Sequence, residues 1–219
     1  DQKGAKNVAI GHGALNVQQF TTATESLNTA VGFAAGISVT TGVSNDIFGA
    51  LAADALTVGS FNSVFGRSAL SADTKGSHSV AIGHAALAVQ NFTTATDTYN
   101  VAVGSQAGGN VTTGINNTLI GGLAGDALTT GVQNTLIGAS IAAEAVGSNN
   151  CVALGFNLTA GAGFTTLGVD ANDIRAAHGT ATWAAVSDER YKKDITDSTL
   201  GLSFINALKP RTFNYKTKG

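Results

Sequence analysis

The sequence has few of the residues from which globular enzymes build active sites and charged surfaces. Its 219 residues include one cysteine, one proline, one tryptophan and no methionine, and only 12% of them are charged. The single cysteine, Cys151, excludes an internal disulfide framework and a cysteine-based zinc site. Solvated disorder is also excluded, because 43% hydrophobic residues provide enough apolar surface to bury.

Long apolar runs and basic clusters are missing as well. No run is long enough to cross a bilayer, so membrane insertion is not expected. The chain begins without a charged-then-apolar leader, which predicts a fragment of a longer protein without a signal peptide. Residues 1–170 carry four basic and nine acidic side chains, whereas residues 171–219 carry eight basic and five acidic ones. Nucleic-acid binding needs a concentrated Lys/Arg face, so no nucleic-acid partner is expected.

Glycine is abundant, with 28 residues, and many of them close a repeated unit. The unit reads Asn-x-apolar-apolar-Gly and occurs ten times with small variations. Successive units are 21, 17, 17, 17, 21, 17, 17, 17 and 13 residues apart, so the pattern repeats after 72 residues. The units end at the following glycines: Gly11, Gly32, Gly49, Gly66, Gly83, Gly104, Gly121, Gly138, Gly155 and Gly168.

Such a repeat predicts a parallel β-solenoid in which each unit starts one coil. The glycine suits a positive φ or a close approach of two backbones. Ala follows it three residues later in eight units, where only a small side chain fits. Seven units begin with an asparagine that suits a stacked amide ladder. These asparagines are Asn7, Asn28, Asn45, Asn62, Asn100, Asn117 and Asn134.

The two apolar positions of the unit alternate between the two faces of a strand. The larger residue, just before each glycine, is predicted to point into the coil. The residue before it is then predicted to point outward and to be covered by other copies of the chain, which predicts an oligomer. The inward set would be Ile10, Val31, Phe48, Phe65, Ile82, Val103, Ile120, Ile137, Leu154 and Leu167, and the outward set includes Ile47, Val64, Leu119 and Leu136.

The unit Asn7-Val-Ala-Ile-Gly11, with Ala14 after it, resembles the head repeat of YadA-type trimeric adhesins. The resemblance covers roughly residues 7–168. It implies a left-handed parallel β-roll assembled as a homotrimer, with longer turns than are usual in that family.

The repetition stops near residue 170, and residues 197–216 read as a helix followed by a strand. The segment Ser187-Asp-Glu-Arg-Tyr-Lys-Lys-Asp-Ile195 and the later Lys209-Pro-Arg-Thr-Phe-Asn-Tyr215 resemble the endosialidase-type intramolecular chaperone domain of bacteriophage tail spikes and fibres. The resemblance implies that Ser187 is a nucleophile and Lys192 its partner, with backbone cleavage next to Ser187 after trimer assembly. A neighbouring lysine can take the proton of a serine hydroxyl and so activate it. Only the start of such a domain is present, which leaves open whether this chain cleaves itself.

Both 21-residue units contain the insertion Phe-Thr-Thr-Ala-Thr, and an extra loop on a regular shaft is a common place for recognition residues. The alternative is that these loops fasten neighbouring chains together. His12 and His84 are expected to be plain surface residues, and no metal or cofactor is expected. The candidate binding residues are Phe20, Thr21, Thr22, Phe92, Thr93 and Thr94.

Together these features predict an all-β protein with 17- and 21-residue coils in an intertwined or side-by-side homotrimer and a short α+β C-terminal segment. The predicted parts are the β-roll (1–170), a connecting segment (171–186) and the start of the chaperone (187–219). The predicted function is a structural and host-adhesion segment of a phage tail fibre, located in the virion and bound to a surface glycan or outer-membrane component. The head of a bacterial trimeric surface adhesin is the alternative. A polysaccharide depolymerase fits less well, because the coils offer only isolated acids.

Overall fold

The computed structural model describes residues 3–180 and 184–185. The chain divides into two compact units, residues 1–186 and 187–219, and the described residues all belong to the first. Every regular element in the described residues is a strand. The helix and strand predicted within 197–216 lie outside them. Where the structure describes the chain, no helix is long and apolar enough to span a membrane.

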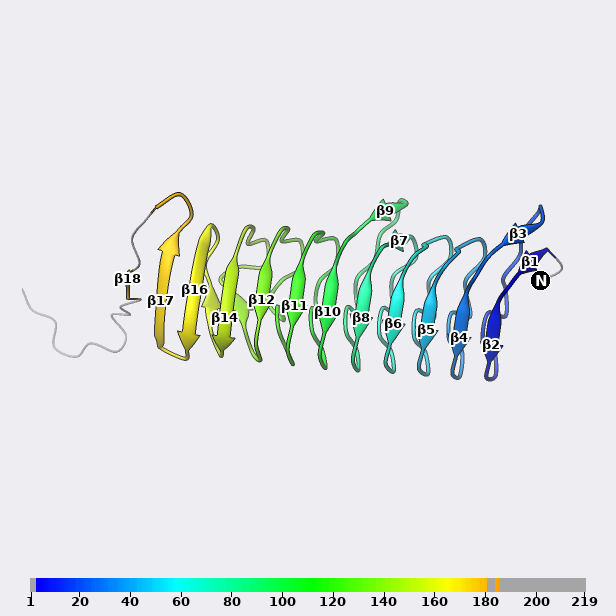
Figure 1. Cartoon of the computed structure of the whole chain (residues 1–219), viewed down its shortest axis with the longest axis horizontal. Helices are drawn as coiled ribbons and strands as arrows, with labels where there is room; N and C mark the ends of the chain where they lie inside the picture. The colour runs from blue at the N-terminus through cyan, green and yellow to red at the C-terminus, as the bar shows by residue number, and fades with distance from the viewer. Residues whose placement is uncertain (1–2, 181–183, 186–219) are drawn as a thin grey trace, which may run out of the picture. The chain divides into compact units, whose positions relative to one another are not determined.

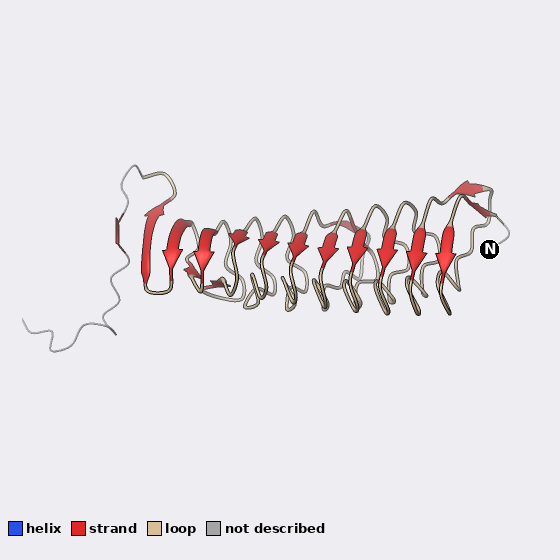
Figure 2. Cartoon of the chain, turned by 60° about the horizontal axis from the view of Figure 1, so that its bottom comes forward, coloured by secondary structure: helices blue, strands red, loops and turns tan. Residues whose placement is uncertain are grey.

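The first unit is a β-solenoid whose coils lie in one row (Figure 1). One strand from each coil joins a twelve-stranded sheet in which the first ten strands are parallel. Figure 2 shows these strands side by side, with loops completing each coil. The strands are β2 (Val8–Ile10), β4 (Thr29–Val31), β5 (Asp46–Phe48), β6 (Ser63–Phe65), β8 (Val80–Ile82), β10 (Val101–Val103), β11 (Thr118–Ile120), β12 (Thr135–Ile137), β14 (Val152–Phe156), β16 (Phe164–Val169), β17 (Asn172–Ala177) and β18 (Ala184–Ala185).

The strand register repeats the unit spacing of the sequence. Thr118 of β11 pairs with Thr135 of β12, a step of one 17-residue coil. Val80 of β8 pairs with Val101 of β10, a step of one 21-residue coil. Each strand therefore places the same repeat position over its equivalent in the next coil, and the predicted parallel solenoid is confirmed.

Three small parallel pairs lie outside the main sheet. Two of them belong to the 21-residue coils, whose loops project above the row in Figure 1. The third lies near the end of the parallel coils. The pairs are β1 (Gly4–Ala5) with β3 (Thr24–Glu25), β7 (Gly76–Ser77) with β9 (Thr96–Asp97), and β13 (Ala142–Ala143) with β15 (Thr159–Ala160).

The direction of the strand side chains differs from the prediction. The residue two positions before each repeat glycine, from Ala30 in β4 to Thr166 in β16, points into the coil and is at most 1% exposed. The larger residue before each glycine points outward instead, and Ile10, Phe65, Ile82, Ile120 and Leu154 are 37–59% exposed. We call the buried residues the inner column and those before the glycines the outer column. The inner column is Ala30, Ile47, Val64, Ala81, Ala102, Leu119, Leu136, Ala153 and Thr166.

The physical reason for this error is the two-residue period of a strand, in which a shift of one residue exchanges the two faces. Size was the wrong criterion, because the interior of each narrow coil is also filled by leucines from its turns. Those leucines leave room only for Ala at several inner positions. The turn leucines include Leu56, Leu70, Leu87 and Leu128, all fully buried.

The glycine of each repeat unit is required for the two predicted reasons, its positive φ and the close approach of the next coil's backbone. Its φ lies between 125° and 152° in all ten coils. A Cβ on Gly32 would lie 2.6 Å from the carbonyl oxygen of Gly49 in the next coil. A side chain here would collide with backbone that is held by the neighbouring strand, so each coil keeps a glycine.

Glycine also makes space for the large members of the inner column. A Cβ on Gly108 would lie 2.7 Å from Leu119 Cδ1 in the next coil. Small and large side chains thus alternate across the interior, as close packing requires.

The parallel coils end at β16, and the remaining strands change direction. β17 pairs antiparallel with β16, and β18 pairs antiparallel with β17. These strands lie within residues 171–186, so the segment between the repeats and residue 187 extends the same sheet. An added antiparallel strand covers a sheet edge that would otherwise present unpaired backbone groups.

Candidate functional site

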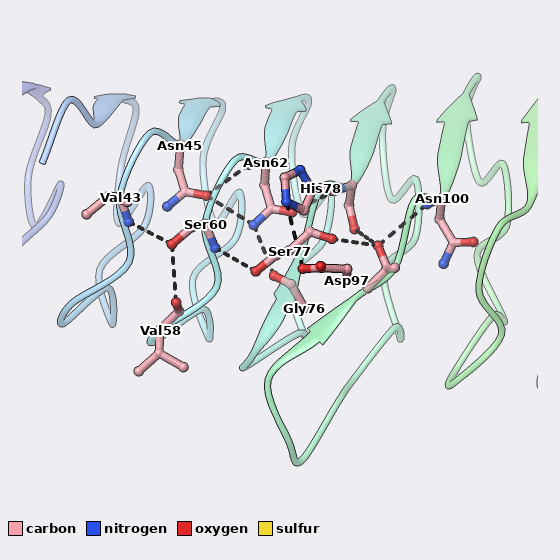
Figure 3. Close-up of polar contacts among 12 residues, drawn as sticks. Val43, Asn45, Val58, Ser60, Asn62, Gly76, Ser77, His78, Asp97 and Asn100 are labelled. Atoms are coloured by element: carbon pink, nitrogen blue, oxygen red, sulfur yellow. Dashed lines mark hydrogen bonds and ion pairs between the residues drawn. The ribbon is translucent and has the colours of Figure 1, made fainter.

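The asparagines at the start of the coils form a buried ladder along the inner side of the sheet. Oδ1 of Asn45 accepts hydrogen bonds from the backbone nitrogen (3.1 Å) and from Nδ2 (3.0 Å) of Asn62 (Figure 3). The same pair of bonds links Asn117 to Asn134, at 3.1 and 2.9 Å. The ladder asparagines from Asn28 to Asn134 are each at most 1% exposed. Each amide therefore ties one coil to the next.

Each amide also closes its own coil. Nδ2 of Asn117 donates to the carbonyl oxygen of Gly131, 14 residues later in the same coil, at 2.9 Å. The same bond joins Asn100 to Gly114 at 2.7 Å. An asparagine side chain offers both a carbonyl oxygen and an amino group, so it satisfies backbone groups on either side without water. Ala or Leu could make neither set of bonds.

A second, shorter ladder of serine hydroxyls runs beside the first. Ser60 Oγ accepts from the backbone nitrogen of Val43, and Ser77 Oγ accepts from the nitrogen of Ser60, both at 3.0 Å (Figure 3). These serines precede the second 21-residue coil, residues 79–99. The regular pattern of bonds changes at that coil.

At the second long coil Ser79 stands where seven of the ten coils have asparagine, and Gln90 replaces the missing amide. Gln90 Oε1 accepts from Asn100 Nδ2 at 2.8 Å. Its Nε2 donates to Ser79 Oγ at 3.0 Å and to Asp73 Oδ2 at 2.6 Å. Both Asp73 and Gln90 are fully buried. A glutamine side chain thus carries the ladder across the longer coil.

Asp73 anchors the loop that this coil adds. Its Oδ1 accepts from the backbone nitrogens of Gly76 (2.9 Å), Lys75 (3.2 Å) and Phe92 (3.3 Å). A buried carboxylate needs such donors, because an unpaired one is costly away from water. The sequence analysis did not single out Asp73 or Gln90. The available signal was their position, eleven residues after the ladder residue, where regular coils have Val39, Leu56, Val111 and Leu128.

The first long coil repeats this arrangement with fewer partners. Asn7 Nδ2 donates to Gln18 Oε1 at 2.7 Å, and Ser26 Oγ donates to Asn7 Oδ1 at 2.9 Å. Gln18 Nε2 is buried without a hydrogen-bond partner among the described residues. Position 1 corresponds to Asp73 by the 72-residue repeat, and it lies outside the described residues.

The predicted binding residues of the two insertions divide into buried and exposed groups. Phe20 is 9% exposed and Phe92 is 6% exposed, so both rings are directed into their own coil. The threonines that follow them are exposed, and the loops project from the row of coils (Figure 1). The phenylalanines therefore anchor the loops, and only the threonines are available to another molecule. The exposed residues are Thr21, Thr22, Thr93 and Thr94.

The residue just before each ladder position has a left-handed backbone conformation in nine coils. Its φ lies between 49° and 63°, from Lys6 to Asn150. This conformation costs about 1–2 kcal/mol for ordinary residues and least for Asn or Gly. Three of the nine positions carry the rings of Phe61, His78 and Tyr99.

The remaining candidates do not assemble into a chemical centre. His12 and His84 are both exposed, and His12 stacks on Phe33 with centroids 5.6 Å apart. Burial and the nearby charge of Glu144 raise the pKa of the Cys151 thiol to about 11. Among the described residues no three His, Cys, Asp or Glu side chains are grouped so as to hold a metal ion. Ser187 and Lys192 lie outside the described residues.

Comparison with known proteins found one similarity, in the second unit. Residues 187–219 match the family model described as the chaperone of endosialidase. These residues include both motifs that carried the resemblance in the sequence. Neither the curated proteins nor the solved structures gave a match to this chain. The chain therefore combines a β-solenoid of about ten coils with a C-terminal segment similar to the endosialidase chaperone.

Proposed function

We propose that this chain is a shaft and host-adhesion segment of a bacteriophage tail fibre, assembled as a homotrimer with the help of its C-terminal segment. The observation that carries the proposal is the chaperone match at residues 187–219, directly after the solenoid. A chaperone of this kind serves the assembly of several chains into an elongated rod, and a row of stacked coils is the form expected of one chain in such a rod.

The outer column supports the trimer. It places a bulky apolar residue on the outer face of every parallel strand, and Phe48 and Phe65 stack there with centroids 4.6 Å apart. An apolar stripe along ten coils is an interaction surface, because single chains seldom leave so much contiguous apolar area in water. Identical chains with cyclic symmetry can cover one another's stripes. The resemblance to YadA-type heads favours three copies.

Self-cleavage is the finer part of the proposal. Lys192 takes the hydroxyl proton of Ser187 while the serine oxygen attacks the neighbouring backbone carbonyl. The C–N bond of that peptide breaks and its nitrogen receives the proton, and water then hydrolyses the resulting ester, which releases the chaperone once the trimer has formed. Replacing Ser187 with Ala in the full-length protein should leave one uncleaved band on a denaturing gel. Two fragments from that variant would refute the assignment.

The proposed location is the virion, with the projecting loops directed at a glycan or outer-membrane component of the host. Immunogold electron microscopy with an antibody against this chain tests the location. Gold along the tails of phage particles is the expected result. Gold on uninfected bacterial surfaces and none on particles would contradict it.

That second labelling pattern would favour the head of a bacterial trimeric surface adhesin. The specific observation in favour of this alternative is the repeat itself, which resembles YadA-type heads over residues 7–168. The chaperone match favours the phage assignment, because adhesins of that type end in a membrane anchor.

A further inference from the structure

Three aromatic rings form an exposed column beside the second long coil. The rings of Phe61 and His78 are stacked with centroids 4.9 Å apart, and those of His78 and Tyr99 are 5.1 Å apart. Phe61 is 53% exposed and Tyr99 is 55% exposed. We call these three residues the aromatic column. Rings that leave this much of their surface in water contribute little to the stability of the chain through burial.

The backbone gives no reason for aromatic residues at these positions. All three have left-handed φ values, of 60°, 60° and 49°. The same position is left-handed in nine coils, including the one with Leu27, so this conformation belongs to the repeat and does not itself call for a ring. The corresponding position in later coils is held by Asn116, Gln133 and Asn150, and asparagine tolerates this conformation best.

The 72-residue repeat provides an internal comparison. One repeat earlier, Tyr99 corresponds to Leu27 and His78 corresponds to Lys6; one repeat later, Phe61 corresponds to Gln133. The solenoid therefore forms at these positions without rings. The aromatic column is a local departure from the repeat and not a requirement of the fold.

A carboxylate lies beside the column. Asp97 Oδ1 is 3.7 Å from His78 Nε2, and its side chain is 61% exposed (Figure 3). The corresponding pair in the first repeat is Glu25 with Lys6, an ion pair at 2.5 Å. Asp97 belongs to β9, at the end of the projecting loop that also carries the exposed Thr93 and Thr94.

We propose that the aromatic column and Asp97 form a glycan-binding site for neutral or amino sugars. The stacked rings cover one another's inner faces, so a pyranose ring can place its C–H groups against the exposed parts of Phe61 and Tyr99. A carboxylate with nearby hydroxyls fixes the O–H or ammonium groups of the sugar. Residues 1–170 carry more acidic than basic side chains, which disfavours anionic sugars. This inference rests on the proposed host-adhesion function and assigns that function to particular residues.

Binding of short oligosaccharides to the full chain tests the site. The probes are glucosamine, N-acetylglucosamine, glucose and galactose oligomers, with sialyllactose as the anionic comparison, measured by saturation-transfer NMR and calorimetry. We expect a neutral or amino-sugar probe to bind at least tenfold more tightly than sialyllactose. No binding of any probe, or preference for sialyllactose, would overturn the proposal.

The variants Tyr99→Leu and Phe61→Gln introduce the residues that the repeat itself uses at these positions. Each should weaken binding at least tenfold and leave the circular dichroism spectrum unchanged. Asp97→Asn should weaken binding of amino sugars more than that of neutral sugars. Phe33→Ala removes another exposed ring, 56% exposed, and is the matched control that should bind normally.

Equal binding by wild type and the column variants would overturn the site. A fall in oligomer mass in Tyr99→Leu would also overturn it, because the rings would then be contacts between chains. The failure of this inference is distinguishable from that of the proposed function. A chain present on virions without glycan binding refutes the site alone, whereas glycan binding by a chain absent from virions refutes the tail-fibre assignment alone.

Discussion

The two faces of the parallel sheet differ in their exposure, in the size of their side chains and in their neighbours. The inner column is at most 1% exposed, mixes Ala with larger residues and lies beside the asparagine ladder. The outer column is uniformly bulky, and Ile10 and Leu154 in it are more than half exposed. The inner side holds one chain in its coils, whereas the outer side is exposed, as the proposed trimer requires.

The largest effect is expected from breaking the ladder on the inner side. In Asn117→Leu, the carbonyl oxygen of Gly131 and the backbone nitrogen of Asn134 lose their buried partners. Each orphaned group costs about 1–3 kcal/mol, so the free energy of unfolding should fall by about 2–6 kcal/mol. Chemical denaturation measures the change.

The neighbouring Asn116 gives the matched control for that variant. It is exposed and has a φ of 59°, which glycine also adopts readily, so Asn116→Gly should change the unfolding free energy by less than about 1 kcal/mol. Equal losses in the two variants would mean that the ladder does not stabilise the coils.

A smaller effect is expected from the apolar part of the inner side. Leu119 is fully buried, so Leu119→Ala leaves a cavity and should cost about 2–5 kcal/mol. Leu123→Ala, in the same coil but at a 40% exposed position, should cost less than about 1 kcal/mol. Thermal unfolding of both variants checks the contrast, and similar midpoints would show that the inner column is not the core.

How much of this contrast can be predicted from sequence depends on the kind of rule involved. The ten coils, the glycine column and the asparagines could be predicted, because each depends on one residue type that recurs at a fixed spacing. The choice of face failed, because Ile120 is larger than the small inner residues and hydrophobicity alone does not fix the phase of a three-residue strand. The left-handed positions of Phe61 and Tyr99 were also missed, because neither residue type favours that conformation.

The polar core of the long coils was missed for a different reason. Asp73 and Gln90 are isolated in the sequence and meet only when one coil lies on the next, 17 residues away. An alignment of whole coils, and not of the repeat motifs alone, would reveal both residues. The chaperone segment was predictable because its motifs are local.

The smallest effect concerns the thiol of Cys151, which follows Asn134 at the C-terminal end of the ladder. Cys151 is fully buried, and its pKa is raised from 9.0 to about 11. The folded chain therefore holds this proton more tightly than the unfolded chain. Its contribution to stability should be complete below pH 9 and be lost as pH rises from 9 to 11. The difference in unfolding free energy between wild type and Cys151→Ala should shrink over that range, and a constant difference would refute a buried neutral thiol.

The outer face provides the most direct test of the account, through the oligomeric mass of the full chain. Sedimentation equilibrium should give three copies for the wild type. Ile120→Lys with Phe65→Lys places two charges on the outer column and should shift the mass toward a single chain while the β-sheet circular dichroism spectrum is retained. A wild type that sediments as one chain, or a double variant that stays trimeric, would contradict the claim that this face assembles the fibre.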